Sequence, residues 1–156
     1  AELRALAETW RPFRLVVDAT GVGAGLADFL SRALPGRVLP FTFTAASKSK
    51  LGWDFLALVE SGRWKEAADA ADDELGRLFA RQMELCQYEI LPGPEKRMRW
   101  GVPDGSRDPL TGQPAHDDLL ISAALCAVLD DQPLPSGGET LIVPGRDPLG
   151  DLDRGF

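Results

Sequence analysis

Residues 15–23 read LVVDATGVG, an apolar run that ends on a carboxylate and enters a glycine-rich turn. The apolar stretch over residues 13–17 has the length and the flanks of a buried strand. The glycines that follow let the chain turn sharply, because glycine accepts backbone conformations that other residues avoid. A strand, a tight turn and a helical pattern in this order predict an α/β unit. Asp18 is then expected at the carboxyl end of the strand, where open α/β sheets bind their ligands.

Periodic apolar residues extend this pattern along the first half of the chain. A short helix is predicted before Arg11-Pro12, and a second strand over residues 37–44, where Pro40 indicates an edge or a bulge. Further amphipathic helices are predicted from three apolar stripes: Val22, Leu26, Phe29, Leu30 and Ala33; Leu51, Phe55, Leu58 and Val59; and Leu75, Leu78, Phe79 and Met83. This alternation favours an α/β layered domain with helices on the faces of its sheet.

The second half of the chain adds a hairpin, a loop and a hydrophobic helix. Residues 87–91 and 97–102 flank a Pro-Gly-Pro turn and predict a β-hairpin. Residues 103–115 are rich in turn formers and predict a long loop that is either disordered or functional. The last helix is predicted over residues 116–129. We expect one domain over residues 1–130 and a flexible tail, rich in Pro, Gly and acids, over residues 131–156.

Composition limits the class of protein. The chain has 156 residues, of which 44% are hydrophobic and 26% charged, as is typical of a globular protein. Its net charge of −7 argues against a basic coat for nucleic acids, although a local basic groove is compatible with that value. No apolar run reaches the roughly 20 residues that a membrane helix requires, so we expect no membrane partner and a cytoplasmic location.

A histidine and two aspartates, His116, Asp117 and Asp118, open the most hydrophobic predicted helix. Aspartate is a favoured helix cap, and acids in the first turn complement the helix dipole. However, one cap needs one aspartate, and neighbouring carboxylates beside a buried helix repel each other unless a divalent cation joins them. Asp18 has the same two interpretations, a structural turn residue or a metal ligand. A phosphate-binding loop after Asp18 is disfavoured, because GVGAG lacks the lysine of a P-loop.

Basic residues near two of the predicted strands are candidates for phosphate contacts. Lys48 and Lys50 follow the second strand, and Arg97 and Arg99 lie in the hairpin beside Trp100. Phosphate contacts and aromatic stacking are common in nucleic-acid binding. The alternative for each is a solvated surface charge. Both interpretations stay open at the level of sequence.

Three stretches in order, DATGVG, FTFTAASKSKLGWDFLALVESGRW and HDDLLISAAL, carry a family resemblance over roughly residues 1–130. The chain resembles the nuclease domain of the large terminase subunit of tailed phages, which has an RNase H-like fold related to the RuvC resolvases. The resemblance implies a three-layer domain with a mixed central sheet and helices on both faces. By this resemblance Asp18 takes the role of the second family carboxylate. Asp118 takes that of the last carboxylate, with Asp117 as its helper and with His116 and Thr20 nearby.

The same resemblance implies Mg2+ or Mn2+ as cofactor and cleavage of concatemeric double-stranded DNA during genome packaging, in a host cell, by a phage or prophage protein. Its partners would be an upstream ATPase domain, the portal and the small terminase subunit.

The chain departs from the family at one point, because the first catalytic aspartate of the family lies on an earlier strand. Glu2 and Glu8 precede Asp18 but belong to a helical pattern, so we expect the first strands of the sheet to be missing and this fragment to be inactive alone. An exposed sheet edge would invite pairing with a second copy. The alternatives are a non-catalytic remnant or assembly domain of the same fold, and a RuvC- or transposase-like nuclease.

Overall fold

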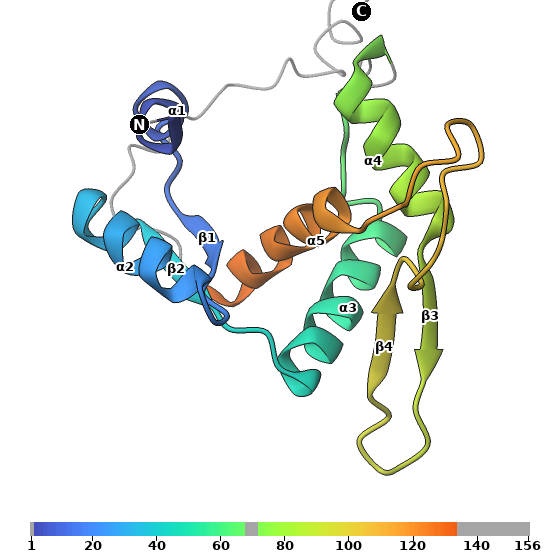
Figure 1. Cartoon of the computed structure of the whole chain (residues 1–156). Helices are drawn as coiled ribbons and strands as arrows, with labels where there is room; N and C mark the ends of the chain where they lie inside the picture. Colours follow the sequence, from blue (N-terminus) through green and yellow to red (C-terminus); the bar gives the residue numbers. More distant parts are fainter. Residues whose placement is uncertain (1, 68–71, 134–156) are drawn as a thin grey trace, which may run out of the picture.

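The computed structural model describes residues 2–67 and 72–133, which fold as a mixed α/β protein (Figure 1). Within these ranges the main elements follow the predicted order of helices and strands. They are α1 (Glu2–Trp10), β1 (Leu15–Asp18), α2 (Gly23–Ala33), β2 (Val38–Phe41), α3 (Ala45–Glu60), α4 (Glu74–Leu85), β3 (Gln87–Ile90), β4 (Met98–Gly101), α5 (Asp118–Ala124) and the 3-10 helix η2 (Leu125–Asp131).

Strands β1 and β2 form a parallel pair, and α2 is the connection between them. The register joins Leu15 to Val38 and Asp18 to Phe41. A Cβ atom at Gly23 would lie 2.5 Å from the carbonyl oxygen of Asp18, so only glycine allows α2 to begin this close to the strand. The predicted strand, glycine turn and helix are confirmed, and Asp18 is the last residue of β1.

Strands β3 and β4 form an antiparallel hairpin that packs on α3. Met98 and Trp100 of β4 are buried, whereas β3 is exposed along its length. The hairpin does not join the parallel pair, and α3 and α5 lie between the two (Figure 1). The expected single mixed sheet is therefore wrong for the described residues, which contain two separate two-stranded sheets. Helices α3 and α5 lie between the hairpin and the parallel pair, so the strand edges of the two sheets do not come together.

The hydrophobic core gathers around α3. Leu51 and Phe55 of α3 pack with Met98 and Trp100 of the hairpin and with apolar residues of the last helical segment: Leu120, Ala124, Leu125 and Ala127. The ring of Trp64 meets Phe55 edge to face at 5.3 Å between ring centroids and closes the core beyond the end of α3.

Two expectations about the helices need correction. The predicted apolar stripe of α2 is only partly buried, because Leu30 is covered whereas Val22, Leu26 and Phe29 are exposed. The sheet of two described strands offers α2 a narrow packing surface, and only Ala27 and Leu30 of α2 are buried. The last predicted helix is shorter as an α-helix, since it tightens to 3-10 geometry from Leu125 onward.

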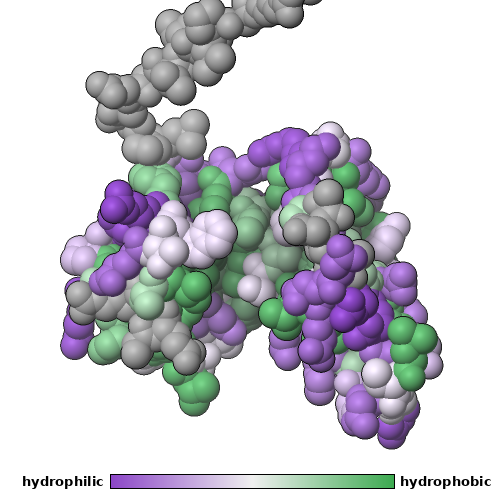
Figure 2. Space-filling view, turned by 90° about the horizontal axis from the view of Figure 1, so that it is seen from above, coloured by the Kyte–Doolittle hydropathy of each residue, from purple (hydrophilic) through white to green (hydrophobic). Residues whose placement is uncertain are grey.

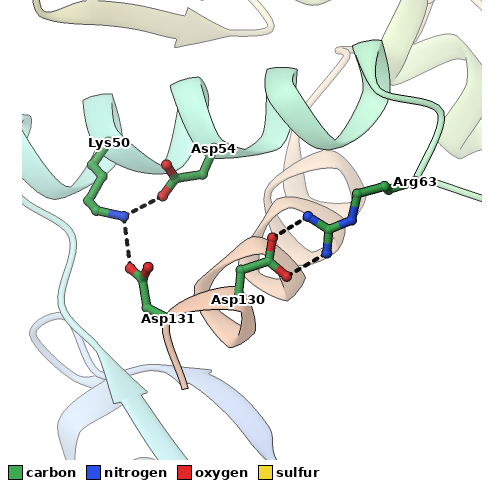
Figure 3. A network of polar contacts seen from close by, with 5 residues as sticks. All are labelled: Lys50, Asp54, Arg63, Asp130 and Asp131. Atoms are coloured by element: carbon green, nitrogen blue, oxygen red, sulfur yellow. Dashed lines mark hydrogen bonds and ion pairs between the residues drawn. The ribbon is translucent and has the colours of Figure 1, made fainter. Parts of the chain in front are cut away.

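An ion-pair network fixes the end of η2 to α3 (Figure 3). Lys50 Nζ donates to Asp54 at 2.6 Å and to Asp131 at 2.9 Å, and Arg63 donates to both oxygens of Asp130 at 2.7 and 2.8 Å. The hydrogen bond to Arg63 lowers the pKa of Asp130, and the hydrogen bonds to Asp54 and Asp131 raise the pKa of Lys50. These pairs are exposed, so their main effect is to orient η2 and their stabilisation is small.

None of the described helices combines the length and the apolar character needed to cross a membrane. The predicted loop over residues 103–115 is ordered, with paired backbone between Arg107 and Pro114. The predicted tail lies, from residue 134 on, outside the described residues.

The close packing of α3 on β4 yields the first prediction. A Cβ atom at Gly52 would overlap the Trp100 indole and lie 2.8 Å from Met98 Sδ. We expect Gly52→Ala to lower the free energy of unfolding by about 1–3 kcal/mol through overpacking, measured by urea denaturation. The control is Gly25→Ala in α2, where a Cβ meets nothing within 4 Å. This change should stabilise the protein by about 0.5–1 kcal/mol. Equal effects at the two glycines would contradict this packing argument.

Candidate functional site

A groove of about 560 Å3 lies between β1 and α5, and it collects the predicted acidic residues. Every residue of β1 lines it, together with Ile121, Ser122 and Leu125 from the last helical segment. Its charged lining residues are Asp18, Asp117, Asp118 and Lys48. Figure 2 looks onto the molecule from above and shows apolar residues in a hollow between its two sides. The groove therefore combines a largely apolar wall with three carboxylates and one ammonium group.

Asp18 is held at the end of β1 by the turn that follows. Its Oδ1 atom accepts a hydrogen bond of 2.7 Å from the backbone N–H of Thr20. The hydroxyl of Thr20 in turn accepts a 2.8 Å bond from the backbone N–H of Phe43, which ties the turn after β1 to the segment after β2. Asp18 is therefore a structural turn residue through its Oδ1 atom. Thr20 fixes the same turn through its hydroxyl. Asp18 still lines the groove.

Asp117 occupies the N-cap position of α5 without capping it. Its side chain makes no cap hydrogen bond. The backbone N–H of Leu120, in the first turn, instead donates to Oε1 of Gln82 on α4 at 3.0 Å. The interpretation of Asp117 as a simple helix cap is therefore wrong. Sequence reasoning missed Gln82. Its spacing from Leu78 and Phe79 places it on the apolar stripe of α4, but the pattern does not show that it contacts α5.

The Asp117 carboxylate faces β4 and Lys48. A Cβ atom at Gly101 would lie 2.5 Å from Asp117 Oδ2, and Gly101 has a φ of 136°, a conformation that favours glycine. Lys48 Nζ lies 3.9 Å from Asp117 Oδ2 and 5.7 Å from the centroid of the Trp100 ring. The backbone carbonyl of Lys48 accepts a 2.7 Å bond from the Trp100 indole N–H. Lys48 is thus anchored on the hairpin with its ammonium group at the groove.

The other predicted DNA-contacting residues do not line this groove. Lys50 pairs with Asp54 of α3 and with Asp131 of η2 (Figure 3). Arg97 pairs with Glu95 at 2.6 Å, and Arg99 lies 3.7 Å from an oxygen of Glu89 across the hairpin. Each of these cations faces a surface acid, which reduces the positive potential that it offers to phosphate. Of the four predicted basic residues, Lys48 lines the groove, and Arg99 lines a neighbouring hollow of about 480 Å3 that also contains Lys48 and Asp117. DNA binding stays a prediction.

His116 lies apart from the main groove. It is exposed and lines a smaller hollow of about 220 Å3 with residues of the loop that precedes α5. Asp117 borders both hollows. His116 is therefore a neighbour of the carboxylates along the chain, but not a lining residue of their groove.

The three aspartates share a groove without forming a closed set of metal ligands. Within residues 2–67 and 72–133, no three His, Cys, Asp or Glu side chains lie close enough together to hold a metal ion. Two contacts explain this arrangement. One oxygen of Asp18 is engaged in its turn, and Asp117 faces Lys48. In the described part of the chain, three aspartates could hold a metal at this site only with a further ligand or after a movement of these side chains.

No protein-family model, curated protein or solved structure matches this chain. The functional interpretation depends on the geometry of the groove and the chemistry of its side chains.

The loop before α5 is fixed by a buried carboxylate. Asp108 Oδ1 accepts bonds from the backbone N–H groups of Leu110 at 2.8 Å and Thr111 at 3.2 Å, and its Oδ2 lies 2.6 Å from Nε of Arg81 on α4. The N–H of Leu110, the N–H of Thr111 and the guanidinium of Arg81 together lower the pKa of Asp108. The charged form is thus the one that holds the loop.

A pH dependence follows from this lowered pKa. The contribution of Asp108 to stability is complete above the ordinary aspartate pKa of about 3.9, and it is lost as the pH falls through the lower value of the folded state. We expect Asp108→Asn to reduce the free energy of unfolding at neutral pH and to flatten its acid decline, measured by urea denaturation over a pH series. Asp104→Asn, in the same loop, is the control and should leave the slope unchanged. An acid decline that is identical in Asp108→Asn and wild type would contradict the assignment.

Proposed function

We propose that this chain is a nuclease domain similar to that of the large terminase subunit, acting on double-stranded DNA with Mg2+ or Mn2+. The observation that carries the proposal is the shared groove of Asp18, Asp117, Asp118 and Lys48. The residues that the resemblance singles out as second and last carboxylates thus line one cavity, although they are 100 positions apart in the sequence. Their carboxylate oxygens are the ligands that hard divalent cations prefer.

The chemistry of the groove fits phosphodiester hydrolysis. A bound divalent cation supplies an activated water and stabilises the leaving oxygen. Asp18 on β1 and Asp118 on α5 would hold that cation. Lys48 contacts the phosphate, because its ammonium group lies at the same groove and its backbone is anchored by Trp100. Asp117 keeps Lys48 oriented through their 3.9 Å approach and adds a carboxylate beside Asp118.

Two aspartates would bind the cation in this chain, and catalysis would require a further carboxylate, which a strand paired with the free edge of β1 would bring. In the described residues β1 pairs with β2 along one edge only. All four residues of β1 line the groove, so the other edge opens into it. An extended segment paired with this edge satisfies the free backbone groups and places a side chain beside Asp18. That strand comes from a completed sheet or from a second copy of the chain. In a packaging motor the further partners are an ATPase domain, the portal and the small terminase subunit.

A second candidate is a non-catalytic assembly domain of the same fold. Two observations favour it: the turn that engages Asp18, and the Lys48–Asp117 approach, which balances part of the negative charge of the groove. A RuvC- or transposase-like nuclease would use the same groove. It differs from the first candidate in its DNA substrate and not in the chemistry of the site.

Cation binding tests the proposal directly. We expect the chain to bind Mn2+ in calorimetric titration, and Asp18→Asn and Asp118→Asn each to weaken binding by about tenfold or more, equivalent to about 1.4 kcal/mol. The matched control is Asp54→Asn, which removes the same charge from α3 at a position outside the groove. Equal loss in all three variants, or no Mn2+ binding by the wild type, would refute the metal site.

Nicking of supercoiled plasmid separates the two candidates. In a longer polypeptide that completes the sheet, the nuclease candidate predicts nicking that requires Mn2+ and that Asp118→Ala abolishes. Nicking that is unchanged in Asp118→Ala would show that the roles are assigned wrongly. Mn2+ binding without any nicking by the completed protein would favour the assembly domain.

A further inference from the structure

Helix α4 contains a buried glutamine, Gln82, whereas the other residues of the helix are apolar or more exposed. Gln82 is 5% exposed and is the buried residue of α4, a helix that is otherwise strongly amphipathic. A buried amide group costs stability unless it forms hydrogen bonds, so a partner is required. The partner in this structure is the backbone of α5, in the turn that carries the two aspartates.

The contact is the one that an N-cap side chain normally makes. The first N–H groups of a helix have no partner within the helix, and the side chain at the N-cap usually accepts from the second or third of them. In α5 the N-cap is Asp117 and the third helical residue is Leu120. Oε1 of Gln82 accepts from the Leu120 N–H at 3.0 Å. A residue of another helix therefore performs the capping that Asp117 is placed to perform.

Because Asp117 does not cap α5, its carboxylate is free to point away from the first turn of the helix. Its Oδ2 atom lies against Gly101, where a Cβ would come within 2.5 Å, and 3.9 Å from Lys48 Nζ. The carboxylate is thus turned toward Gly101 and Lys48, and Lys48 and Asp117 both line the groove.

We propose that Gln82 is a positioning residue: by capping α5 from outside, it keeps the Asp117 carboxylate in the groove and available to a cation or to Lys48. The proposal has two halves. The structural half, that Gln82 caps α5 and so directs Asp117, stands on the contacts alone. The functional half, that this helps cation binding, rests on the proposed function. Removal of the Gln82 acceptor leaves the Leu120 N–H without its partner. The Asp117 carboxylate is on the same turn, at the standard cap position, and it rotates to take over the cap.

A stability cycle tests the structural half without any metal. In the wild type, Asp117→Ala should shift the urea midpoint only slightly, because Asp117 does not cap α5. In a Gln82→Met background, where Asp117 has become the cap, the same substitution should produce a midpoint shift at least twice as large. Equal shifts in both backgrounds would overturn the proposal. If Gln82→Met does not fold, Gln82→Asn serves instead, since its shorter side chain withdraws the acceptor.

Mn2+ titration tests the functional half. Gln82→Met should weaken Mn2+ binding several-fold. In an Asp117→Asn background, Gln82→Met should have no further effect. Gln87→Met, the same change at an exposed glutamine, is the control. A wild type that fails to bind Mn2+ would refute the proposed function, and the stability cycle would still decide the role of Gln82. Unaltered Mn2+ affinity in Gln82→Met, with the wild type binding, would overturn the positioning role.

Discussion

The rest of the structure depends on the close approach of α3 to β4 at Gly52. The absence of a side chain there lets the Trp100 indole reach the carbonyl of Lys48, while the buried hydroxyl of Ser49 accepts the N–H of Met98 at 2.8 Å. These two hydrogen bonds hold one edge of the hairpin on the first turns of α3. They fix Lys48 and Gly101 beside the start of α5, so a contact in the core sets the geometry of the groove.

The charges of the protein are distributed so that the groove stays acidic. Three aspartates line it against one lysine. The other predicted basic residues pair with acids on the surface, as Lys50 does with Asp54 and Asp131. With a net charge of −7 for the whole chain, this arrangement attracts cations to the groove more readily than it attracts DNA. Binding of DNA would therefore depend on the cation, or on positive charge from a partner.

Local sequence patterns were sufficient where neighbouring residues determine the structure. The apolar run, Asp18 and the glycine turn into α2 were predicted because strand length, acid and glycine act within a few positions. The ordered hairpin followed from its Pro-Gly-Pro turn. Sequence also placed Asp117 and Asp118 at the start of a helix. In each of these cases the information lies within one supersecondary unit.

The remaining features arise from contacts between distant segments. Gln82 is hydrogen-bonded to Leu120, 38 positions away in the sequence, and Trp100 to Lys48, 52 positions away. No periodicity encodes such pairs. The separation of the two sheets and the exposed stripe of α2 likewise depend on which surfaces are available for packing. The RNase H-like arrangement suggested by the resemblance remains a proposal for the same reason, because its defining feature is a sheet assembled from distant strands.

The central claim is that Asp18 and Asp118 share one divalent cation. The most direct measurement is a crystal structure grown with Mn2+, with the ion located by anomalous scattering. The account predicts an ion in the groove with oxygens of both aspartates at roughly 2.0–2.6 Å, the range of hard cation–oxygen bonds. An ion bound instead at the exposed acids Asp130 and Asp131, or an empty groove at saturating Mn2+, would contradict it.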